Sequence, residues 1–138
     1  MDEKELLDKF KDLRQHVQGN EVAPHKPLLI LYALERLGLS DTRTIPYAHV
    51  DEDLGELLSE FSSTKTRSPQ YPFWRLQKDG VWEVTSDGEL ASRASNKDPK
   101  KSELVSKNAR GGFPEDIYEA LCSSGSLLQD VKQAVLLR

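Results

Sequence analysis

Residues 24–39 read PHKPLLILYALERLGL, and the run from Leu28 to Leu37 is apolar on nearly every side. A helix with this pattern is buried around most of its circumference. Pro27 suits the first turn of a helix, where its missing N–H group costs nothing. The segment is therefore predicted to be the buried helix at the centre of the fold.

Shorter amphipathic helices are predicted around this central helix. The first predicted helix extends to about Gln18, and its apolar residues recur at helical spacing: Leu6, Leu7, Phe10, Leu13 and Val17. A second amphipathic helix is predicted over residues 51–61, with the apolar residues Leu54, Leu57, Leu58 and Phe61. Residues 45–50 are predicted to form a short strand. Further helices are predicted over residues 87–93, 102–107 and 113–123, and from a cap at Ser126 to the chain end.

The segment YPFWRLQKDGVWEV, residues 71–84, is predicted to be a β-hairpin. A three-residue loop at residues 78–80, with Gly80 left-handed, sets its register and places Arg75 opposite Glu83. The same register turns four apolar side chains toward the core, namely Trp74, Leu76, Trp82 and Val84. The predicted fold class is mainly α with a small antiparallel β-hairpin, an α+β and winged-helix-like single compact domain over residues 1–138.

A cytoplasmic protein is predicted from the ends and the composition of the chain. No apolar run reaches the roughly 18 residues that span a bilayer, and MDEKELLDKF does not resemble a signal peptide. The one cysteine, Cys122, cannot form an internal disulfide, which fits a reducing compartment. The apolar helix that stops at Arg138 without a cap predicts that the chain is part of a longer protein.

Charge is unevenly distributed along a chain whose net charge is −4. Residues 64–110 hold ten Lys and Arg against six Asp and Glu, a net of +4, and the remainder holds nine against seventeen, a net of −8. Nucleic acid is bound mainly through Lys and Arg. The asymmetry therefore favours one face for a polyanion, although ordinary solvated loops explain it equally well.

Two segments could contact a phosphate chain, one at the start of the central helix and one at the entrance of the predicted hairpin. His25 and Lys26 stand where the central helix begins, next to free N–H groups that attract anions. The alternative is that His25 only caps the helix. Closer to the hairpin, Tyr71 and Pro72 follow a basic stretch made of Lys65, Arg67 and Ser68. The alternative there is a plain turn or core element.

The segment SKNARGGF, residues 106–113, is the third candidate. Lys107 and Arg110 precede Gly111 and Gly112, whose missing side chains would let another backbone approach closely. A flexible turn is the alternative interpretation.

Metal-dependent catalysis has no support in the sequence. The three histidines, His16, His25 and His49, form no HExxH or similar ligand motif. The acids at residues 51–53 point in different directions at a predicted helix start, where they complement the helix dipole. No enzyme activity, metal site or cofactor is therefore predicted for this chain.

In this order, APHKPLLILYALERL, YPFWRLQKDGVWEV and NARGGF resemble the sulfur-binding domains of phosphorothioate-dependent HNH restriction endonucleases. The resemblance covers most of the chain. It implies binding of double-stranded DNA in which sulfur replaces a non-bridging phosphate oxygen, and a covalently linked HNH nuclease elsewhere in the polypeptide. This sequence contains no HNH motif, so the resemblance implies a targeting domain without cleavage.

The resemblance also implies roles for individual residues. Tyr71 and Pro72 would wall an apolar sulfur pocket near Arg75, where the family has a small apolar residue. His25 and Lys26 would hold the surroundings of the modified phosphate. The implied contacts to DNA backbone or bases are Lys65, Arg67, Ser68, Asn108, Arg110 and Gly111.

Physical chemistry explains how an apolar pocket could discriminate. Burial of one sulfur gains only about 1 kcal/mol. An oxygen that loses its hydration in the same pocket without meeting a donor costs about 1 to 3 kcal/mol. Two other functions stay open: a winged-helix-like reader of unmodified DNA, with Arg75 and Arg110 on guanine edges, and a protein-interaction domain that uses the acidic remainder.

Overall fold

A computed structural model of the chain describes residues 2–12, 17–18, 21–22, 25–37, 42–61, 69–88, 90 and 98–136. The helices in these ranges are α1 (Glu3–Lys11), α2 (His25–Leu37), α3 (Tyr47–Phe61), α4 (Gln70–Arg75), the 3₁₀ helix η1 (Leu76–Asp79), α6 (Lys101–Ser106), α7 (Glu115–Ser123) and α8 (Gly125–Leu136). The strands are β1 (Val17–Gln18), β2 (Glu21–Val22), β3 (Thr44–Pro46), β4 (Glu83–Thr85) and β5 (Arg110–Gly112). The mainly α class with a small antiparallel sheet is confirmed.

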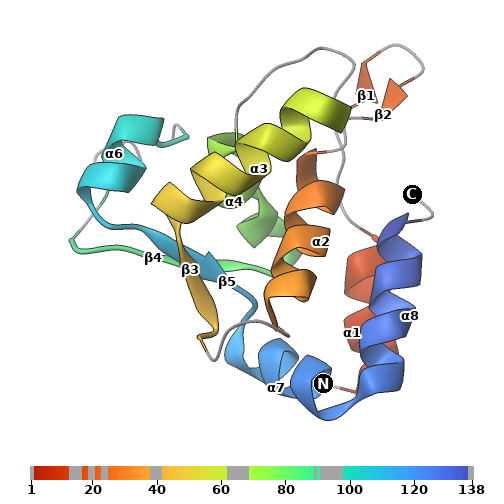
Figure 1. The fold of residues 1–138 in the computed structure, drawn as a ribbon. Helices are drawn as coiled ribbons and strands as arrows, with labels where there is room; N and C mark the ends of the chain where they lie inside the picture. Colours follow the sequence, from red (N-terminus) through yellow and green to blue (C-terminus); the bar gives the residue numbers. More distant parts are fainter. Residues whose placement is uncertain are drawn as a thin grey trace.

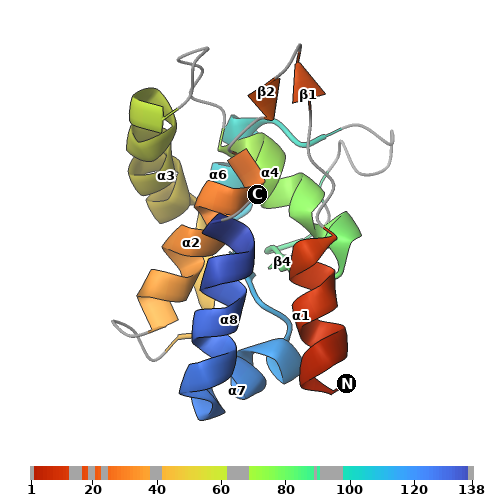
Figure 2. The same ribbon diagram turned by 90° about the vertical axis from the view of Figure 1, so that its right-hand side faces the viewer.

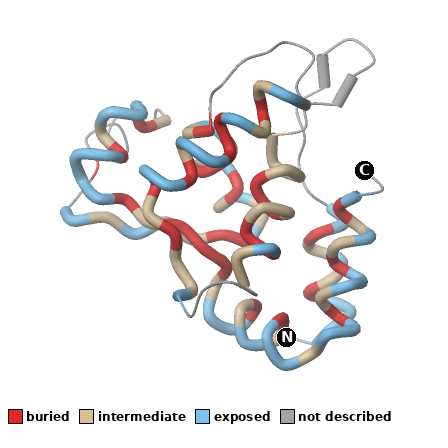
Figure 3. Tube along the Cα trace, in the orientation of Figure 1, coloured by how far each residue is buried: buried red, intermediate tan, exposed pale blue. Residues whose placement is uncertain are grey.

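Helix α2 lies at the centre of the fold, as its apolar sequence predicts. Its buried residues are Leu29, Ile30, Ala33 and Leu34. Helices α3, α4 and α8 all pack against it, and α8 also packs against α1 and α7. The two ribbon views show this arrangement, with α1 and α8 on one side of α2 and α3 on another (Figures 1 and 2). Buried residues gather along these contacts (Figure 3).

Three short antiparallel strands form the sheet, in the order β3-β5-β4. In the central strand Gly111 lies between Ile45 of β3 and Val84 of β4. Because side chains alternate along a strand, these three positions share the inner face. The outer face is made of Thr44, Pro46, Glu83, Thr85, Arg110 and Gly112. Strands β1 and β2 pair separately.

A row of edge-to-face aromatic contacts runs through the core beneath the sheet. Tyr47 contacts Phe73 at 4.9 Å between ring centroids, and Phe73 contacts Trp82 at 6.1 Å. Trp82 contacts Phe113 at 5.8 Å, and Phe113 contacts Phe10 of α1 at 6.0 Å. Such pairs add to the free energy gained from burial. They join α1, α3, α4 and the sheet into one core.

The prediction of a β-hairpin over residues 71–84 is wrong. Its first half is helical, because the buried residues Pro69, Pro72, Phe73 and Leu76 recur three and four positions apart. Pro72 also has no N–H group to donate to a strand ladder, whereas the first turn of a helix tolerates it. β4 pairs with β5 instead of with residues 71–76. Gly80 is left-handed as predicted, with a φ of 78°, but it ends η1.

Several predicted element boundaries are also wrong. The first helix ends at Lys11, and Val17 and Gln18 lie in a strand. Residues 47–50, predicted to be strand, form the first turn of α3. The Oγ of Ser124, in place of Ser126, accepts the capping bond from the N–H of Leu127 at 3.2 Å. The helix predicted over residues 87–93 lies mostly outside the described residues.

None of the helices in the described ranges is both long and apolar enough to cross a membrane.

Candidate nucleic-acid interface

Tyr71 and Arg75 form an exposed pair on α4. Their i, i+4 spacing places them on one helix face, and the Arg75 guanidinium carbon lies 4.8 Å from the centroid of the Tyr71 ring. Tyr71 is 42% exposed, which is unusual for a large aromatic side chain. Arg75 also donates from Nε to Oδ2 of Asp98 at 2.9 Å and from Nη2 at 2.5 Å. An aromatic face and a guanidinium therefore meet at the surface.

Pro72, the second residue implied to wall the pocket, is buried. Its i, i+4 neighbour is Leu76, the buried first residue of η1, and both side chains face the core. In the described structure it therefore contributes to the core more than to an open surface.

The N-terminus of α2 lies beside η1, which continues from α4. Lys26 donates from Nζ to Oδ2 of Asp79 at 2.6 Å, and the two side chains are only 14% and 2% exposed. Lys26 is thus the counter-charge of a buried carboxylate, which differs from the phosphate contact that the sequence implied. His25 begins the helix at a half-buried position. The contact of Lys26 with Asp79 joins the start of α2 to η1.

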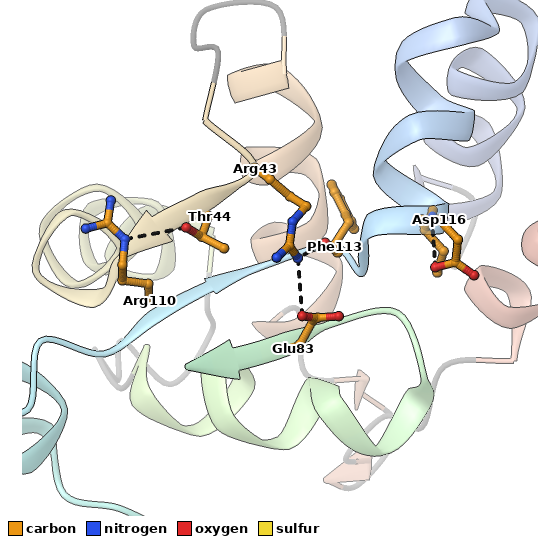
Figure 4. A network of polar contacts seen from close by, with 7 residues as sticks. Arg43, Thr44, Glu83, Arg110, Phe113 and Asp116 are labelled. Carbon is orange, nitrogen blue, oxygen red and sulfur yellow. Dashed lines mark hydrogen bonds and ion pairs between the residues drawn. The ribbon is translucent and has the colours of Figure 1, made fainter. Parts of the chain in front are cut away.

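Arg43 crosses the outer face of the sheet. It donates to the carbonyl oxygen of Phe113 at 2.8 Å and lies 3.3 Å from a carboxylate oxygen of Glu83 on β4 (Figure 4). Gly112 pairs with Thr44 on one side and with Glu83 on the other. Because Gly112 has no side chain, Arg43 can reach from one edge strand to the other across β5. This arginine has a structural role.

Arg110 occupies the neighbouring position on the same outer face. Its Nε donates to the Thr44 hydroxyl at 3.4 Å, and in the described ranges no carboxylate is within ion-pair distance of it (Figure 4). Asn108, two residues earlier, is exposed and left-handed with a φ of 50°. Its side chain lies 3.4 Å from Asp87. Arg110 thus retains hydrogen-bond donors and a charge that a polyanion could use.

The segment from Asp98 to Arg110, which includes α6, runs from the ion-pair partner of Arg75 to the start of β5. Asp98, which binds Arg75, precedes α6 by three residues, and Lys101 at its start pairs with Asp51 of α3 at 2.8 Å. The chain leaves α6 through Asn108 and enters β5 at Arg110. This side of the molecule lies opposite α1 and α8 (Figure 1). Among the described residues, Lys100, Lys101 and Lys107 in and beside α6 are exposed.

The two glycines of β5 have a different role from the predicted one. A Cβ on Gly111 would lie 2.7 Å from both Phe73 and Trp82, and one on Gly112 would lie 2.2 Å from the carbonyl oxygen of Arg43. Both residues are buried. The backbone that approaches Gly112 is therefore that of the protein's own β3 edge. Gly111 faces the core, so a DNA contact at this residue could involve only its main chain.

Three predicted contacts, Lys65, Arg67 and Ser68, lie outside the described residues. Sequence reasoning in turn missed Asp98, Asp79, Arg43 and Thr44. The acid pairs could not be found from spacing, because Asp98 and Asp79 are 23 and 53 residues from their partners. No local motif marks such contacts.

The acids at the start of α3 have structural partners. Asp51 accepts from the Tyr47 hydroxyl at 3.0 Å, and Asp53 accepts from the Tyr32 hydroxyl at 2.7 Å. Burial is the main cause that raises the pKa of Tyr47 and of Tyr32 above the usual range, and the hydrogen bonds to these carboxylates raise it further. Both hydroxyls therefore stay protonated donors. Among the residues that can be described, no cluster of three possible metal ligands occurs.

A surface groove of about 470 Å³ lies between α1 and η1, away from Tyr71. It is lined by Glu5, Asp8, Lys9, Asp12, Lys78 and Asp79. Four carboxylates against two lysines make this groove unfavourable for a polyanion.

The chain folds as a small α+β domain, and α4, the segment around α6 and β5 carry the candidate contacts. The family model described as "ScoMcrA-like, DNA sulfur-binding domain" matches residues 3–138. The chain belongs to this family.

Solved structures have the same fold. The sulfur-binding domain of ScoMcrA complexed with phosphorothioated DNA superposes with a TM-score of 0.80 at 23% identity, over 96% of this chain and 85% of that one. The corresponding complex of SprMcrA gives 0.78 at 24% identity, over 99% and 85%. The Type IV phosphorothioation-dependent restriction endonuclease ScoMcrA gives 0.77 at 23% identity, over 94% of this chain but 28% of that one. A comparison with curated protein sequences found no match.

Proposed function

We propose that this chain binds double-stranded DNA carrying a phosphorothioate linkage and targets a restriction endonuclease to it. The observation that carries the proposal is the family match over residues 3–138. Two of the structural relatives, the sulfur-binding domains of ScoMcrA and SprMcrA, are described as complexes with phosphorothioated DNA.

The exposed part of Tyr71, on α4, is the surface that we assign to the sulfur. The half-exposed Tyr71 ring offers an apolar, polarisable face at the surface, and sulfur contacts aromatic rings favourably. Arg75 and Arg110, with Asn108, supply donors for neighbouring phosphates or base edges. His25 completes the set at the N-terminus of α2, where helix N–H groups favour an anion.

The parent protein is proposed to carry an HNH nuclease domain linked to this one. The full-length ScoMcrA chain is several times longer than the part that aligns here. In this proposal the chain binds the DNA and another domain of the parent protein cleaves it. A cytoplasmic location stays a prediction of the sequence.

A binding titration tests the function. Matched duplexes are used, one unmodified and two carrying a single sulfur of either stereochemistry. One sulfur diastereomer is expected to bind at least about fivefold more tightly than the unmodified duplex, from sulfur burial alone. Affinity should also fall with salt, because cations are released from the DNA. Equal affinity for all three duplexes would support a reader of unmodified DNA, and no binding would support a protein-interaction domain.

Arg110→Ala is expected to weaken binding to every duplex about tenfold, as loss of a charge-assisted hydrogen bond does. Because the only described partner of Arg110 is Thr44 at 3.4 Å, the melting temperature should stay within a few degrees of the parent's. The matched control is Lys11→Ala, which removes one exposed charge from α1 on the opposite side. If the two variants lose affinity equally, Arg110 makes no specific contact and contributes only to net charge.

A further inference from the structure

The guanidinium of Arg75 covers one face of the tyrosine that the proposed function assigns to the sulfur. Tyr71 and Arg75 are one helical turn apart, and their groups are stacked at 4.8 Å. Arg75 keeps half of its side-chain surface exposed, while Asp98 is 27% exposed. A DNA group that contacts the exposed part of Tyr71 would therefore lie beside this guanidinium.

Asp98 fixes the guanidinium and uses only part of its hydrogen-bonding capacity. A guanidinium has five N–H donors. Two of them, on Nε and Nη2, point at the same oxygen of Asp98, which leaves about three for another acceptor. The planar group is thus held in place over the ring with its remaining donors available.

Resting on the proposed function, we infer that Arg75, positioned by Asp98, sets how strongly this chain prefers sulfur over oxygen. An apolar wall excludes an unmodified phosphate, because the oxygen loses its hydration and gains no donor. Arg75 supplies such donors, and an ionised oxygen accepts them more strongly than sulfur does. The arginine therefore relieves the penalty that would otherwise reject unmodified DNA.

Asp98 is expected to act against Arg75 in the preference for sulfur or oxygen. The carboxylate neutralises the guanidinium and occupies two of its donors. Without it, the full charge and all five donors would be available to a phosphate. Loss of Asp98 should therefore favour the unmodified duplex, whereas loss of Arg75 should disfavour it.

Arg75→Met tests the inference in the 138-residue chain, because methionine keeps an apolar stem and removes every donor. The measured quantity is the ratio of dissociation constants for the unmodified duplex and for the preferred sulfur duplex. Arg75→Met is expected to raise this ratio at least about fivefold over the parent's, even though both affinities fall. Asp98→Asn is expected to lower the ratio by tightening binding to the unmodified duplex.

Lys100→Met is the matched control, because Lys100 is exposed, lies two residues beyond Asp98 and loses the same charge. It should weaken both duplexes equally and leave the ratio unchanged. A ratio equal to the parent's in Arg75→Met would overturn the inference, as would a rise in Asp98→Asn. If Arg75→Met does not fold, Asp98→Asn alone decides. Failure of the proposed function is seen separately, as absence of DNA binding by the parent chain, and the inference then fails with it.

Discussion

Lys26→Met is expected to lower the free energy of unfolding by about 3 to 5 kcal/mol, the cost of removing one partner of a buried ion pair. The carboxylate of Asp79 is 2% exposed and lies 2.6 Å from the ammonium. Methionine preserves the length of the side chain, so the loss reports the charge and not a cavity. Urea unfolding followed by tryptophan fluorescence measures the change, because Trp82 is buried in the core.

The double variant Lys26→Met with Asp79→Leu is the control. Replacing both partners by apolar side chains removes the buried carboxylate together with its ammonium partner, and such replacements are often neutral. The double variant should therefore recover most of the lost stability. A Lys26→Met protein that unfolds like the parent but binds DNA weakly would contradict this assignment. Lys26 would then contact the DNA directly, as the family resemblance implies.

The central helix could be predicted because its signal is long and uniform. From Leu28 to Leu37 nearly every position is apolar, and the only arrangement that buries all sides of a helix is one with neighbours all around it. Pro27 lies in its first turn and does not break it. Here local propensity and tertiary packing agree, so the sequence determines both the element and its place.

The first half of residues 71–84 is helical where the sequence predicts a strand, because the two-residue period of a strand and the 3.6-residue period of a helix compete within a few residues. Aromatic residues such as Trp74 and Trp82 are typical of strands, and Gly80 is typical of a hairpin loop. The helical signal is carried by Pro72 and Phe73 of α4, which has only six residues, and by Leu76 at the start of η1. A helix this short is stabilised by packing against α2 and α3 more than by its own propensity. The tertiary contacts therefore decided the structure.

The candidate site could be predicted only in part. The sequence and the family resemblance named Tyr71 and Arg110 as candidates, and the structure leaves both at least partly accessible, while their contact with DNA stays a prediction. The sequence could not identify which cations are already neutralised. Arg43 and Arg110 lie on one face of the sheet, yet Glu83 lies beside the first and no described carboxylate beside the second. That difference depends on strand pairing, and sequence patterns do not report it.

Gly112→Ala is expected to reduce the free energy of unfolding by about 3 kcal/mol, the upper end of the range for overpacking. The new Cβ would lie 2.2 Å from the carbonyl oxygen of Arg43 and 3.1 Å from the Cα of Thr44. Arg43 directly precedes β3 and Thr44 begins it, and because both atoms belong to the backbone, no side-chain rotation can relieve the clash. Separation of β3 from β5 would also break the contact of Arg43 with Glu83.

Gly125→Ala is the matched control for this substitution, because nothing lies within 4 Å of a Cβ at that position in α8. It should leave stability unchanged or raise it by up to about 1 kcal/mol. Urea unfolding of the two alanine variants should therefore differ clearly in midpoint. DNA affinity provides a second measurement, since Arg110 is two residues from Gly112 in the same strand. If Gly112→Ala unfolds at the parent's midpoint, β3 does not pack against β5 as closely as described, and the outer face that presents Arg110 must be arranged differently.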